Sequence, residues 1–105
     1  MTLFEKTITA FKNKDIVIFE DIHHEDFMFV QQFSMSSREE HLANIKEWLA
    51  DDTDTWHNRV KCIHEDEYVL IMRSSKVDSS GAEIITNNVS IKKDGLYWRT
   101  MVNDD

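Results

Sequence analysis

The chain of 105 residues is 41% apolar and 10% aromatic, carries a formal net charge of −8 and contains one cysteine. This length supports a single domain over residues 1–105, and the apolar fraction excludes a disordered chain. The negative charge argues against nucleic acid or an anionic membrane as a partner, because phosphate binding needs a basic surface. With one cysteine, no signal-peptide pattern and no run of about 20 apolar residues for a membrane span, we expect a cytoplasmic protein.

The first half of the chain contains the start signals of three helices. In segments 2–5 and 37–40 a hydroxyl residue is followed three places later by Glu, which is the capping-box pattern. Apolar residues then recur at helical spacing, so we expect helices over about 3–11 and 38–50. Asp15 is placed to cap a shorter helix between them.

The second half alternates apolar and polar residues, which is typical of strands. Asp94-Gly95 predicts a tight hairpin turn, since Gly readily adopts positive φ, and short links of this kind pair neighbouring strands antiparallel. Earlier in the chain, we expect residues 23–26 to form a loop and the acidic run 51–54 to end the third helix. The predicted strands cover residues 27–33, 56–64, 68–77, 82–93 and 96–102.

Three short segments match a known family. They are Phe11-Lys12-Asn13-Lys14-Asp15, Ser37-Arg38-Glu39-Glu40-His41-Leu42 and Lys93-Asp94-Gly95-Leu96. Together with the order of elements, they resemble the nuclear transport factor 2-like superfamily, specifically its SnoaL-like branch. The resemblance implies an α+β fold in which a strongly curved antiparallel or mixed sheet of about five strands wraps on three helices. It also implies a cone whose mouth admits a ligand.

The resemblance does not carry over the catalytic groups of one well-known activity. The ketosteroid isomerases of the superfamily use an aspartate base, a tyrosine and an aspartic acid, and the matching positions here fall near Val30, Thr7 and Asn87. Valine cannot accept a proton, so isomerase chemistry in that style is disfavoured. Asn87 could still donate a hydrogen bond to an oxyanion.

Asp26, His41 and Glu83 are the candidate catalytic groups. Asp26 stands near the mouth end of the first strand, His41 borders the apolar stripe of the third helix, and Glu83 shares a strand face with Asn87. We expect that face to line the cavity, because its other members are apolar. The alternatives are a backbone-bonded Asp26, a boundary histidine and a rim carboxylate in water. The residues expected on that inner face are Glu83, Ile85, Asn87, Val89 and Ile91.

Two tryptophans and two arginines are candidate ligand-binding residues, together with Asn87. Trp48 and Trp56 could stack on a flat ligand or pack in the core. Arg73 and Arg99 interrupt apolar strands and could hold an anionic group of a ligand, or pair with acids on the outer face.

We expect no metal and no cofactor. The cluster at residues 23–26 has adjacent residues rather than the wider ligand spacing of zinc sites, and the two glycines sit at turns rather than in a phosphate loop. A second apolar or mixed sheet face predicts a homodimer through the sheet, as the resemblance also implies. The residues expected on that outer face are Tyr68, Leu70, Met72, Trp98, Thr100 and Val102.

The sequence therefore predicts a small-molecule-binding protein with an apolar cone-shaped pocket, and it leaves open whether the protein is an enzyme. As an enzyme, it would run metal-independent acid–base chemistry of the isomerase, cyclase or dehydratase type. The alternative is a non-catalytic dimeric module for protein interaction or ligand sequestration.

Overall fold

The helices begin at the expected residues in a computed structural model that describes residues 1–51 and 55–104. Thr2 Oγ1 accepts the Glu5 N–H at 3.1 Å, and the Glu5 carboxylate accepts the Thr2 N–H at 2.9 Å. Ser37 and Glu40 form the same reciprocal pair, and Asp15 accepts the Val17 N–H at 3.0 Å. The described helices are α1 (Leu3–Asn13), α2 (Ile16–Ile22), α3 (Arg38–Ala50) and α4 (Trp56–Arg59).

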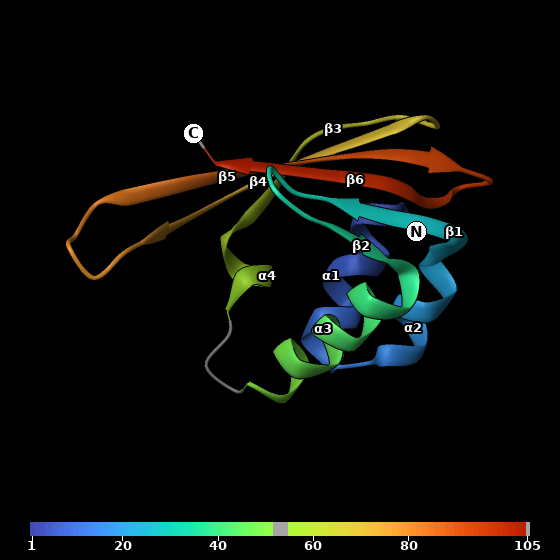
Figure 1. The fold of residues 1–105 in the computed structure, drawn as a ribbon, viewed down its shortest axis with the longest axis horizontal. Coiled ribbons are helices and arrows are strands. Elements are labelled where there is room, and N and C mark those ends of the chain that lie inside the picture. The colour runs from blue at the N-terminus through green and yellow to red at the C-terminus, as the bar shows by residue number, and fades with distance from the viewer. Residues whose placement is uncertain (52–54, 105) are drawn as a thin grey trace.

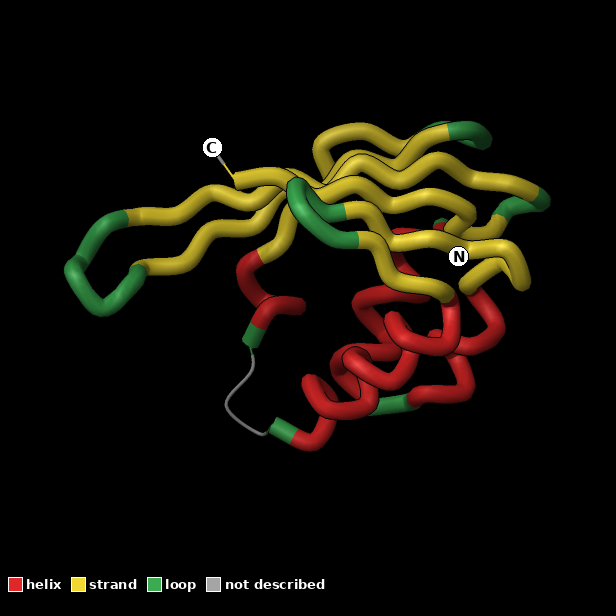
Figure 2. Tube along the Cα trace, in the orientation of Figure 1, coloured by secondary structure: helices red, strands yellow, loops and turns green. Residues whose placement is uncertain are grey.

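The described strands form one mixed sheet in the order β2-β1-β6-β5-β4-β3. β1 runs parallel to β6 and antiparallel to β2, and the other neighbours are antiparallel. The helices pack against one face of the sheet (Figures 1 and 2). Since β2 and β3 are not paired with each other, the sheet is curved but open. The strand bounds are β1 His23–Val30, β2 Met35–Ser37, β3 Val60–Glu65, β4 Val69–Val77, β5 Glu83–Lys93 and β6 Leu96–Asp104.

Two local expectations are wrong. Residues 23–26 belong to β1 rather than to a loop, because the side chain of His23 caps α2 and lets the chain enter the strand directly. Trp56–Arg59 forms the helix α4 instead of opening a strand, and the ring of Trp56 packs 4.8 Å from that of Phe11. β2 adds a short sixth strand. Asp51 caps α3, and the rest of the acidic run, residues 52–54, lies outside the described residues.

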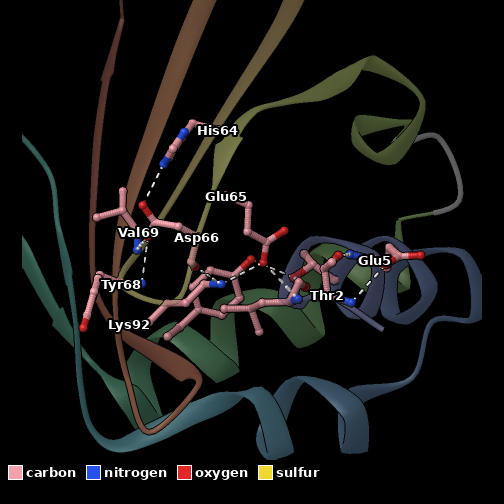
Figure 3. A network of polar contacts seen from close by, with 11 residues as sticks. Thr2, Glu5, His64, Glu65, Asp66, Tyr68, Val69 and Lys92 are labelled. Carbon is pink, nitrogen blue, oxygen red and sulfur yellow. Dashed lines mark hydrogen bonds and ion pairs between the residues drawn. The ribbon is translucent and has the colours of Figure 1, made fainter.

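A nearly buried ion pair fixes α1 to the sheet. The carboxylate of Glu65, at the end of β3, accepts hydrogen bonds from Lys92 Nζ at 2.8 Å and from the Leu3 N–H at 3.1 Å (Figure 3). Lys92 Nζ also donates to the Asp66 carbonyl at 2.7 Å. The side chains of Lys92 and Glu65 are only 9% and 13% exposed. The first turn of α1 is therefore tied to two strands from the other half of the chain.

The face assignment of the sheet is the reverse of the expected one. On β5, Ile84, Thr86 and Asn88 line the cavity under the helices, and Ser90 is fully buried on the same face. The alternate set from Glu83 to Ile91 therefore lies on the outer face. Counting apolar residues misled the prediction, because a cavity wall carries polar groups whereas this outer face is apolar.

The set of residues expected on the outer face is also wrong on β4 and β6. On β4, Leu70 and Met72 are buried in the core under the helices. On β6, Thr100 and Val102 line the cavity, while Trp98 is the extra residue of a bulge opposite Ile91 and Lys92. The bulge changes the alternation of β6, so Tyr97 and Thr100 are both buried.

Candidate functional site

A cavity of about 520 Å³ lies between the inner face of the sheet and the helices. Its deepest lining residues are buried: Thr7 of α1, Phe19 of α2, His23 of β1 and Tyr97 of β6. At the other end the cavity is lined by exposed side chains, namely Gln31, Trp48 and Lys76. The cavity therefore runs from a buried floor to a solvent-exposed rim.

His23 is held at the floor by the end of a helix. Its Nδ1 lies 2.6 Å from the carbonyl oxygen of Phe19, one of the last carbonyls of α2. A carbonyl can only accept, so Nδ1 carries the proton and Nε2 of the neutral ring is an acceptor. Burial lowers the pKa of His23 to about 4, which keeps the ring neutral at physiological pH.

His41 of α3 lies beside His23 in a cage of aromatic rings. Its ring stacks on Phe29 with centroids 4.5 Å apart, and it lies 5.1 Å from Phe27 and 5.4 Å from His23. Among the described residues, its buried Nδ1 has no hydrogen-bond partner. Burial, reinforced by the neighbouring His23, lowers the pKa of His41 to about 3. An unpaired polar atom in the core costs stability, so packing alone does not account for a histidine here.

Tyr97 and Thr7 form a hydrogen-bonded pair at the floor. Thr7 Oγ1 donates to the carbonyl of Leu3 at 2.8 Å, and the Tyr97 hydroxyl lies 2.7 Å from Thr7 Oγ1. Because the single proton of Thr7 is used by the carbonyl, the Tyr97 hydroxyl must be the donor to Thr7. Burial raises the pKa of Tyr97, so the phenol stays protonated.

The walls of the cavity have one apolar and one polar side. The helix side is aromatic, with Phe11 and Trp56 in contact and Trp48 at the rim. The sheet side carries small polar groups, including Asn88 and Thr100, and Thr100 Oγ1 bonds Ser90 Oγ at 2.8 Å. Such a cavity suits a flat organic molecule with a few polar groups.

Three residues predicted for the site line this cavity. They are His41, a candidate acid or base, and Trp48 and Trp56, candidate stacking surfaces. Their roles toward a ligand stay predictions. His41 also contacts Trp48 edge to face at 6.0 Å, so these two candidates act on the same part of the cavity.

The other predicted residues lie outside the cavity. Arg73 Nε donates to Asn87 Oδ1 at 2.9 Å; Arg73 is exposed and Asn87 is half-buried, and Glu83 is exposed at the start of β5. Arg99 stacks 3.9 Å from the ring of Trp98 and donates to the carbonyl of Asp26 at 2.6 Å. Arg99, Trp98 and the exposed Asp26 line a shallow groove apart from the cavity.

Sequence reasoning missed His23, Tyr97 and Thr7 as a group. His23 lies in the polar run of residues 23–26, which predicted a loop. The sequence of β6 did not indicate that Tyr97 faces inward. A usable signal was the spacing of four between Phe19 and His23, which allows a histidine to bond the carbonyl that ends a helix.

Metal-ligating residues do not gather in groups of three or more in residues 1–51 and 55–104. Within the same residues, each helix is too short or too polar to cross a bilayer.

No protein-family model and no curated protein matches the sequence, but solved structures match over almost the whole chain. An NTF2-like protein of unknown function from Burkholderia xenovorans aligns with a TM-score of 0.71 and 13% identity, covering 98% of this chain and 80% of its own. IdmH, a proposed polyketide cyclase from Streptomyces antibioticus, gives a TM-score of 0.69 and 14% identity, covering 98% and 89%. TsrD from Streptomyces laurentii gives 0.62 and 17%, covering 98% and 85%. The architecture expected from the sequence is thus confirmed, and the chain has the nuclear transport factor 2-like fold.

Proposed function

We propose that this protein binds a small, mainly apolar organic molecule in the cavity between the sheet and the helices. The observation that carries the proposal is the pair of buried, neutral histidines, with ring centroids 5.4 Å apart, both lining a cavity of about 520 Å³. A volume of this size is within the usual range for ligand pockets. The likeness to IdmH is consistent with an organic ligand but, at 14% identity, does not extend its activity to this chain.

Binding is better supported than proton abstraction. The pKa values of about 4 and about 3 make His23 and His41 weak bases, whereas efficient general bases have a pKa near the working pH. Neutral imidazoles at a buried floor are instead well suited to hydrogen bonding with a ligand. If a cyclase, isomerase or dehydratase step takes place here, these two histidines are the groups in reach of the ligand.

A thermal-shift screen tests this proposal. Small aromatic phenols, ketones and carboxylates are each added to the wild type and to the Trp48→Ala variant, which removes a wall of the cavity. A ligand at 100 times its Kd stabilises the protein by about 2.7 kcal/mol, so a clear rise in Tm is expected. Trp98→Ala, on a tryptophan outside the cavity, is the matched control and should keep the shift. The proposal would be contradicted if no compound raises the Tm of the wild type, or if Trp48→Ala and Trp98→Ala reduce the rise in Tm equally.

We also propose a homodimer through the outer face of the sheet. Cross-strand neighbours Ile71, Val89 and Met101 form an apolar row there, and the helices all lie on the opposite face (Figure 2). Ile91 and Met101 are 37% and 38% exposed in the single chain. An apolar row of this kind can pack against the same row of a second copy across a twofold axis, so a second copy is the fitting cover.

Light scattering distinguishes the proposed dimer from a monomer. The proposal expects about twice the chain mass of 12.4 kDa for the wild type and the single-chain mass for Val89→Glu. Thr9→Glu, on α1, is the matched control and should leave the dimer intact. A wild type that remains monomeric at 100 µM would contradict the dimer without affecting the ligand proposal.

A further inference from the structure

The hydrogen bonds at the cavity floor fix which polar groups a ligand can present. This inference rests on the proposed function, because it assumes that the cavity takes a ligand. At the floor, two polar atoms come from His23 and Tyr97, whose rings lie 5.1 Å apart. The proton of each is already used by a protein acceptor, the Phe19 carbonyl for His23 and Thr7 Oγ1 for Tyr97.

Both atoms are therefore left as acceptors. His23 Nε2 has a free lone pair, and the described residues provide it with no hydrogen-bond partner. Tyr97 Oη has a remaining lone pair, since its own proton points to Thr7. A ligand group that only accepts would leave both atoms desolvated and unpaired, which is costly in a buried site.

Charged ligand groups are disfavoured at the floor. At His23 Nε2 and Tyr97 Oη an anionic group would meet acceptors rather than donors. A cationic group would find no carboxylate among the described residues that line the cavity, and the charged side chains there are the cations Arg59 and Lys76. A buried charge without a partner is strongly disfavoured.

We propose that the cavity is selective for uncharged aromatic or apolar ligands that carry a hydroxyl or N–H donor, with His23 Nε2 and Tyr97 Oη as the recognising acceptors. The donor lies at the floor, and the apolar body extends along the aromatic wall toward Trp48. His23 and Tyr97 are thus specificity-determining residues of the site.

A matched pair of compounds tests the selectivity: 4-propylphenol and its methyl ether, titrated calorimetrically at pH 7.5. The wild type should bind the phenol at least tenfold more tightly than the ether. His23→Asn places an amide N–H where Nδ1 was, so it can keep the bond to the Phe19 carbonyl while removing the Nε2 acceptor. In this variant the preference should fall to threefold or less.

Tyr97→Phe provides a second test if His23→Asn does not fold, and it should also reduce the preference. Thr9→Ala, on α1 but not among the residues that line the cavity, is the control and should keep the preference. If the wild type binds phenol and ether within threefold of each other, the selectivity is wrong while the binding function stands. If the wild type binds neither compound, the inference is overturned, and the thermal-shift screen separately decides the proposed function.

Discussion

The two cavity histidines make the stability of the fold depend on pH. Their folded pKa values of about 4 and about 3 lie below the ordinary value of 6.5. The unfolded chain therefore binds more protons, so the free energy of unfolding falls as the pH drops below 6.5 toward 4. At pH 5 each histidine should reduce this free energy by about 2 kcal/mol, and the two together by about 4 kcal/mol.

Urea unfolding followed by tryptophan fluorescence at pH 7.5 and pH 5.0 measures this effect. The window ends at pH 5 because most carboxylates still hold their charge there. The double variant His23→Asn with His41→Phe keeps two planar side chains but removes both titrating groups. It should lose about 4 kcal/mol less than the wild type between the two pH values. The three remaining histidines are present in both proteins, so their effect cancels. Equal losses in the two proteins would refute the reasoning.

The remaining predictions concern stability at pH 7.5, measured by the same urea unfolding. Lys92→Met should lower the free energy of unfolding by about 3 kcal/mol, because it leaves Glu65 nearly buried without its cation, and a loss below about 1 kcal/mol would contradict the buried ion pair. Ser37→Ala should cost about 1 kcal/mol through the lost N-cap of α3, while the neighbouring Ser36→Ala should cost much less. His41→Phe should raise stability by about 1 kcal/mol by removing the unpaired Nδ1, and a net loss would show that Nδ1 is satisfied.

The sequence predicted the helices well because their signals are local. The capping pairs Thr2–Glu5 and Ser37–Glu40 lie within one turn and need no tertiary contact to form. The hairpin at Asp94-Gly95 is equally local, with positive φ at both residues. Together with the order of the elements, these features were sufficient to identify the fold.

The site was predicted less well because it depends on which sheet face meets the helices. On β5 the outer face holds Ile85, Val89 and Ile91, while the inner face holds Thr86 and Asn88. The apolar count therefore pointed the wrong way, and Asn87 and Glu83 were assigned to the cavity with the wrong face. Alternation alone does not say which of the two sheet faces meets the helices. The bulge at Trp98 then changes the alternation on β6. Only the packed structure decides between them.

The position of β6 also has a consequence for how the protein is made. It is the last described strand in the sequence, yet it lies in the middle of the sheet between β1 and β5. Until residues 96–104 have left the ribosome, the two parts of the sheet that β6 joins, β1–β2 and β3–β5, stay separate, and the edge of each part that will pair with β6 is uncovered. A nascent chain in this state exposes strands that can pair with other chains, so completing β6 joins the sheet and removes that hazard in one step.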